Sequence, residues 1–95
     1  MGYEYNVKFE IDRSDEIEEL LKSLPYFQKT DVFQNRLQFL YRSPKNSGRM
    51  PSAVAEIESD SIYFCDYGGG SEVLKELIYR VGLSYKKLEV IDHND

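Results

Sequence analysis

The chain has 95 residues, of which 41% are hydrophobic and 31% are charged, and its formal net charge at pH 7 is −5. This length predicts a single domain over residues 1–95 with one hydrophobic core. No stretch approaches the ~20 consecutive apolar residues of a membrane-spanning helix. The acidic balance disfavours general binding to nucleic acid or to an anionic membrane. The single cysteine permits no disulfide within the chain, which favours a reducing, cytoplasmic location.

The first two predicted elements are a strand and a helix. Residues 3–11 alternate apolar and polar side chains, which is typical of a strand with one covered face. A helix is predicted over residues 14–24, because four apolar side chains recur there at helical spacing. Ser14 is suited to cap this helix at its N-terminus. Pro25 is suited to end it, since the residue before a proline avoids helical backbone angles.

The middle of the chain predicts a short connector over residues 26–31 and a long strand over residues 32–43. Residues 44–52 contain two prolines and a glycine and are predicted to form a loop. A β-hairpin is then predicted, with strands over residues 53–58 and 62–67 and a tight turn at Ser59 and Asp60.

The last third predicts a glycine corner, a helix and a final strand. The consecutive glycines of residues 68–70 end the hairpin, and a helix is predicted over residues 71–81 with Ser71 as its N-cap. Gly82 is placed to stop that helix. A last strand is expected over residues 86–91, followed by a frayed tail over residues 92–95.

The resulting order of elements is β-α-β-β-β-α-β, which predicts an α+β domain. Each helix has a single apolar stripe, so we expect two helices packed on one face of a mostly antiparallel five-stranded sheet. This arrangement resembles the ferredoxin-like plan with one added strand, whose place in the sheet the sequence does not give. The resemblance is one of topology and implies no function, because folds of this kind host many functions.

The charge distribution is the most informative feature for function. Residues 32–55 contain no Asp or Glu but hold Arg36, Arg42, Lys45 and Arg49, which gives this segment a charge of +4. The whole chain carries −5, so the remaining residues carry −5 − 4 = −9. A basic segment on an acidic body favours contact with an acidic protein surface.

The second feature is the sheet face that the helices would leave open. Its expected side chains are Glu4, Asn6, Lys8, Glu10, Gln34, Gln38, Leu40, Val54, Tyr63 and Cys65. Apolar side chains with a polar rim are typical of an interface. We therefore interpret the chain as a non-catalytic protein-interaction module, binding a partner protein or a second copy through this face and the 42–52 loop. The predicted partner-binding residues are Arg36, Leu40, Arg42, Lys45, Arg49, Met50 and Tyr63.

Two other functions remain open alternatives. A small ligand or anion could bind backbone N–H groups at the glycine corner, formed by Gly68, Gly69, Gly70 and Ser71. A nucleic acid could bind the basic segment 32–55, although the acidic body opposes it.

No set of residues predicts catalysis, a cofactor or a metal centre. Cys65 is followed by Asp66, whose negative charge opposes formation of a reactive thiolate. His93 is the only histidine and falls in the expected tail, so it is a poor base for a nucleophile. The acidic and imidazole groups of residues 92–95 form one short run, which does not supply the fixed geometry of a metal site.

Overall fold

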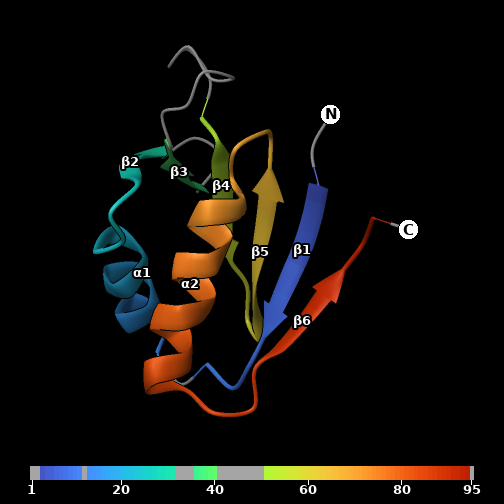
Figure 1. The fold of residues 1–95 in the computed structure, drawn as a ribbon. Coiled ribbons are helices and arrows are strands. Elements are labelled where there is room, and N and C mark those ends of the chain that lie inside the picture. The colour runs from blue at the N-terminus through green and yellow to red at the C-terminus, as the bar shows by residue number, and fades with distance from the viewer. Residues whose placement is uncertain (1–2, 12, 32–35, 41–50, 95) are drawn as a thin grey trace.

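The computed structural model describes residues 3–11, 13–31, 36–40 and 51–94. Within these ranges the chain forms an α+β fold of two helices and six strands (Figure 1). In chain order the elements are β1 (Tyr3–Lys8), α1 (Ser14–Lys22), β2 (Phe27–Asp31), β3 (Arg36–Phe39), β4 (Ala53–Ile57), β5 (Ser61–Asp66), α2 (Ser71–Ser84) and β6 (Glu89–Asp92).

The strands form one open antiparallel sheet in the order β2-β3-β4-β5-β1-β6. The expected antiparallel sheet with two helices is confirmed, but the expected number of five strands is wrong. The additional strand is β2, which lies in the segment predicted as a connector. A register shift between Phe27 and Lys29 interrupts the alternation of side chains in this strand. The period of two that identifies a strand is therefore broken in the sequence.

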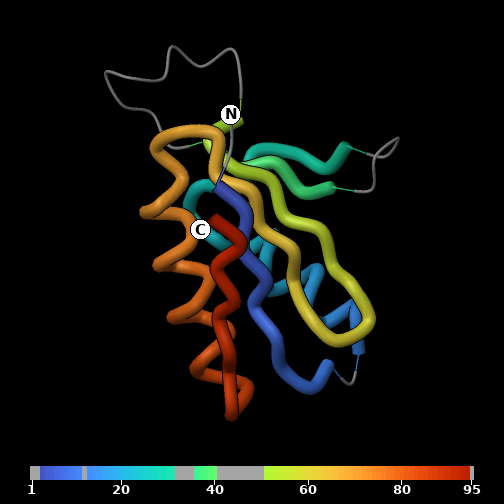
Figure 2. Tube along the Cα trace, turned by 90° about the vertical axis from the view of Figure 1, so that its right-hand side faces the viewer, coloured from blue at the N-terminus to red at the C-terminus, as the bar shows by residue number. Residues whose placement is uncertain are grey.

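One face of the sheet carries the hydrophobic core and both helices. Val7 of β1, Phe39 of β3 and Phe64 of β5 are fully buried in this core. Ile17 of α1 and Leu77 of α2 belong to the same buried cluster. Figure 2, turned by 90°, shows α2 running along one side of the sheet. Because successive side chains of a strand point to opposite faces, the alternate residues of each strand face away from the helices.

Both helices begin at the first residue of their predicted ranges, but their caps and ends differ from the prediction: α1 ends at Lys22 and not at Leu24, and the N-cap of α2 is Gly70 and not Ser71. α1 starts at Ser14 itself, with Arg13 in the N-cap position and without a side-chain capping bond. α2 starts at Ser71 but continues to Ser84, so Gly82 lies inside the helix and does not end it. Gly82 has no positive φ, and a glycine stops a helix chiefly where it takes that left-handed conformation.

The C-terminal segment also differs from the prediction. β6 pairs with β1 over Glu89–Asp92, and the backbone N–H of His93 donates to the carbonyl of Glu4 at 3.0 Å. The expected frayed tail is therefore wrong for residues 92–94, because β1 offers these residues an edge with free hydrogen-bonding groups. Of the long strand predicted over residues 32–43, the described part is β3 and Leu40; the rest lies outside the described residues.

Replacing Leu77 tests the packing of the hydrophobic core. This side chain is fully buried, so Leu77→Ala should lower the free energy of unfolding by roughly 2–5 kcal/mol in a urea melt. Tyr79 on the same helix is 62% exposed, and Tyr79→Ala should change stability by no more than about 0.5 kcal/mol. Equal effects of the two changes would contradict this packing.

Gly82 tests where α2 ends. A Cβ atom at this position would lie 3.5 Å from Leu88 Cδ1, which is an ordinary contact distance. Gly82→Ala should therefore stabilise the protein by about 0.4–1 kcal/mol, because alanine restricts the unfolded chain and fits the helical backbone. A loss of stability in thermal melts would instead indicate a left-handed residue at the helix end.

Candidate functional site

The candidate site is the face of the sheet opposite the helices, which we call the open face. The strand register pairs Asn6 of β1 with Tyr63 of β5, and Tyr63 with Glu56 of β4. Arg36 of β3 lies beside Glu56, because Leu37 pairs with Ala55 one position away. The fold thus brings one row of polar and aromatic side chains across four strands.

Arg36, a predicted partner-binding residue, is held within this row. Its Nε lies 3.3 Å from Glu56 Oε2, and its guanidinium carbon lies 5.8 Å from the centroid of the Tyr63 ring. The side chains of Arg36 and Glu56 are about one-third exposed, at 32% and 35%. The ion pair offsets the positive charge of Arg36, and the contact with Tyr63 restricts where its guanidinium can lie.

Tyr63 extends the row toward β1. Its hydroxyl donates a hydrogen bond to Glu4 Oε1 at 2.5 Å. Burial and then this hydrogen bond raise the pKa of Tyr63 above its usual value, so the hydroxyl stays protonated as a donor. Tyr63 therefore contacts the carboxylate of Glu4 through its hydroxyl and the guanidinium of Arg36 through its ring.

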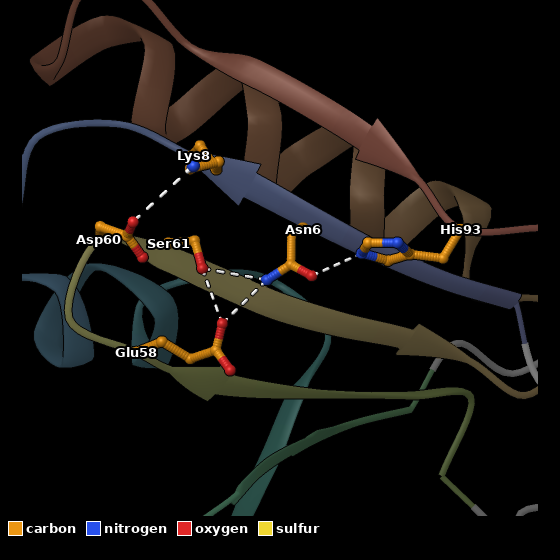
Figure 3. A network of polar contacts seen from close by, with 6 residues as sticks. All are labelled: Asn6, Lys8, Glu58, Asp60, Ser61 and His93. Atoms are coloured by element: carbon orange, nitrogen blue, oxygen red, sulfur yellow. Dashed lines mark hydrogen bonds and ion pairs between the residues drawn. The ribbon is translucent and has the colours of Figure 1, made fainter.

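A polar network centred on Asn6 lies beside this row (Figure 3). Asn6 Nδ2 donates to Glu58 Oε1 at 2.9 Å and to Ser61 Oγ at 3.0 Å, and Ser61 Oγ donates to the same carboxylate oxygen at 2.7 Å. Asn6 Oδ1 lies 2.7 Å from Nε2 of His93. Because Oδ1 is an acceptor, Nε2 carries the proton in this contact.

The network forms one wall of a hollow of about 250 Å³. The hollow is lined by Asn6, Lys8, Glu58, Asp60, Ser61 and Ile91. Lys8 Nζ and Asp60 Oδ2 are 3.8 Å apart across it. The hydroxyl of Ser61 bonds to Glu58 and Asn6 and has no contact with the imidazole of His93 (Figure 3). These hydrogen bonds connect β1, β5, the turn between β4 and β5, and the C-terminal segment.

The predicted partner-binding residues fall into three groups. Arg36 and Tyr63 are brought into contact on the open face. Leu40 follows β3, is half-buried, and donates its backbone N–H to the carbonyl of Tyr26 at 2.8 Å. Arg42, Lys45, Arg49 and Met50 lie outside the described residues.

Cys65 and Val54 are opposite each other on β5 and β4, and each is only 5% exposed. Val54 therefore adds little apolar surface to the open face, contrary to the expected patch. The thiol of Cys65 is buried, whereas a reactive cysteine is at least partly accessible. His93 lies on the open face and bonds to Asn6, a placement that the sequence did not indicate because the two residues are separated by most of the chain.

The glycine corner is closed by the protein's own carboxylate. Asp66 Oδ1 accepts hydrogen bonds from the backbone N–H groups of Gly68 and Gly70, at 2.8 and 2.9 Å. Gly68 and Gly69 have positive φ values of 127° and 76°, which glycine adopts readily. These are two of the four residues of the predicted anion site, so an anion that uses their N–H groups would have to displace Asp66.

Three further observations bear on function. In the described part of the chain, no group of three or more His, Cys, Asp and Glu residues could hold a metal ion. Among the described residues, no helix is long and apolar enough to cross a membrane. Comparisons with protein-family models, with curated proteins and with solved structures find no match to this chain.

Gly70 tests the closed corner. A Cβ atom at this position would lie 2.7 Å from Asp66 Oδ1 and 2.8 Å from the carbonyl oxygen of Ser52, both too close for a carbon atom. Gly70→Ala should therefore destabilise the protein by roughly 1–3 kcal/mol. Gly82→Ala is the matched control, because the same replacement inside α2 meets no clash. A neutral effect of Gly70→Ala in a urea melt would show that the corner opens freely.

Proposed function

We propose that this protein is a non-catalytic interaction module that binds a protein partner, or a second copy of itself, through its open face and the 42–52 loop. The observation that carries the proposal is the Glu4–Tyr63–Arg36 arrangement on a sheet face that neither described helix covers. Tyrosine and arginine are enriched among the residues that dominate binding energy at protein interfaces.

Pre-positioning of these side chains favours binding. A flexible arginine loses conformational freedom when a partner fixes it, which weakens the complex. Arg36 is already restricted by Glu56 and by the ring of Tyr63, so less freedom remains to be lost. The same contacts leave parts of both side chains accessible, since Arg36 and Tyr63 are half-buried.

Charge supports an acidic protein surface as the partner of the 42–52 loop. The acid-free segment 32–55 carries +4 by sequence, and Arg36 is offset by Glu56. Arg42, Lys45 and Arg49 then supply the remaining positive charge. Three cations on a chain of net charge −5 are few for a phosphate backbone, where binding draws on many cations at once. A protein partner needs fewer charges, because apolar contacts supply affinity while charge sets orientation.

The other proposed properties have their own support. Burial of Cys65 and the bonds of Ser61 to Glu58 and Asn6 support the absence of catalysis. The single cysteine supports a cytoplasmic location. Occupation of the corner amides by Asp66 makes ligand binding at residues 68–71 the weaker alternative.

We also infer that the fold is a ferredoxin-like variant. The elements β1, α1, β4, β5, α2 and β6, with their strands in the order β6-β1-β5-β4, correspond to a split β-α-β plan. On this interpretation the β2–β3 hairpin is an insertion between α1 and β4, and it extends the sheet beyond β4.

A photo-crosslinking amino acid placed at Gln38 tests the proposal. Gln38 is half-buried on the open face, opposite Val54. Illumination in cell extract should give a crosslinked product containing a partner protein or a second chain, identified by mass spectrometry. The same crosslinker at Tyr79, which is 62% exposed on α2, is the control for the helix face.

The charge reversal Arg42→Glu with Arg49→Glu tests the loop. It should abolish the Gln38 crosslink and leave the thermal melt unchanged. Products from the Tyr79 position alone would contradict the use of the open face. A crosslink that survives charge reversal would contradict the part assigned to the loop.

A further inference from the structure

β6 is held to the domain mainly by its backbone. None of its residues is buried, and in the described part of the chain it pairs only with β1. Val90 is 44% exposed, whereas Val7, its cross-strand partner on β1, is fully buried. Detaching β6 would therefore expose little buried apolar surface, but it would leave the backbone groups at this edge of β1 without hydrogen-bond partners.

The segment after β6 completes its attachment to β1. The side-chain amide of Asn94 donates from Nδ2 to the carbonyl of Glu4 at 3.0 Å, and its Oδ1 accepts from the N–H of Glu4 at 2.8 Å. This pair of bonds imitates one further residue of the β ladder. His93 adds a bond from its backbone and a contact from its ring to Asn6. Residues 89–94 thus carry the hydrogen-bonding groups that attach this described segment to β1, while Leu88 just before them packs against the hydrophobic core.

The connection between α2 and β6 is short and strained. It runs from Tyr85 to Leu88, and Lys87 within it has a φ of 61°. Lys87 is the one described residue other than glycine with a positive φ. This conformation is unfavourable for a residue with a Cβ atom, and straightening the connection would relieve it. Tyr85 packs its ring 4.9 Å from that of Phe9, so the start of the connection stays anchored.

We propose that β6 exchanges between two copies of this chain, with the segment after Lys86 of each copy pairing with β1 of the other. Such a swapped dimer contains the same β1–β6 contacts as the monomer, and two straightened connections replace two strained ones. The association uses the edge of β1, so it goes beyond the proposed binding at the open face and does not require it. Each chain carries −5, so salt should favour the dimer by screening the repulsion.

A disulfide trap tests the exchange. Lys8 and Glu89 are exposed cross-strand partners of β1 and β6. One chain carries Lys8→Cys and a second carries Glu89→Cys, both with Cys65→Ala, and the two are refolded together from urea at high concentration and oxidised. The expected product is a disulfide-linked heterodimer. A mixture of Glu89→Cys with Lys75→Cys, on the exposed face of α2, measures links from random collisions. A single chain with both Lys8→Cys and Glu89→Cys should form an internal disulfide, which shows that the variants fold.

Two variants at Lys87 test the connection between α2 and β6. Lys87→Asn and Lys87→Gly fit the left-handed conformation better than lysine does, so they should stabilise the closed monomer. The ratio of dimer to monomer, measured by size-exclusion chromatography with light scattering, should fall roughly fivefold or more. A heterodimer yield no higher than in the collision control, while the internal disulfide forms, overturns the proposal. The proposal is also overturned if neither Lys87→Asn nor Lys87→Gly changes the abundance of the dimer.

Discussion

The two helices and the strands of this protein share a single apolar face, and this constraint determines the remainder of the described structure. Val7, Phe39 and Phe64 lie on one face of three different strands, and the apolar stripes of α1 and α2 both pack against that face. Alternation along each strand then sends the polar partners of these residues to the other face. The open face is therefore a direct consequence of burial, and its composition is set by the alternate positions of the same strands.

The strand register places acidic side chains beside a basic residue of the acid-free segment, which the charge pattern of the sequence does not show. Arg36 belongs to a segment without acids, yet β4 places Glu56 beside it, and β2 places Asp31 opposite it. Both acids lie just outside the segment in the sequence. In antiparallel pairing, residues that flank a segment in the sequence can lie beside residues within that segment. An uninterrupted run of one charge along the chain therefore need not form a surface of one charge in the fold.

Local patterns in the sequence predict local structure well here. The alternation in residues 3–11 identifies β1, and the apolar stripe beginning at Val73 identifies α2. The missed strand β2 has a register shift between Phe27 and Lys29 that interrupts its alternation. The extent of α2 was missed because glycine is common just after a helix ends, and only its φ distinguishes that position from one inside the helix.

The candidate site was predictable only in part, for a related reason. The alternation of β1 and β5 places Asn6 and Tyr63 on the open face, and both were expected there. The contact of Asn6 with His93 depends on β6 pairing with β1, which joins the two ends of the chain. The closure of the glycine corner by Asp66 depends on the turn conformation of Gly68 and Gly69. Neither follows from residue spacing.

The position of β1 inside the sheet has a consequence for synthesis of the chain. β1 leaves the ribosome before the other described strands, but its neighbours β5 and β6 are among the last of the described elements to be made. Until Ser61–Asp66 emerges, the alternating side chains of Tyr3–Lys8 have no partner strand, and both edges of the strand remain open to other chains. Contacts of such long sequence separation form slowly, and unpaired apolar strands are prone to aggregate. Among the described strands, β1 therefore waits longest for its partner strands, and it is the one most open to association with other chains during translation.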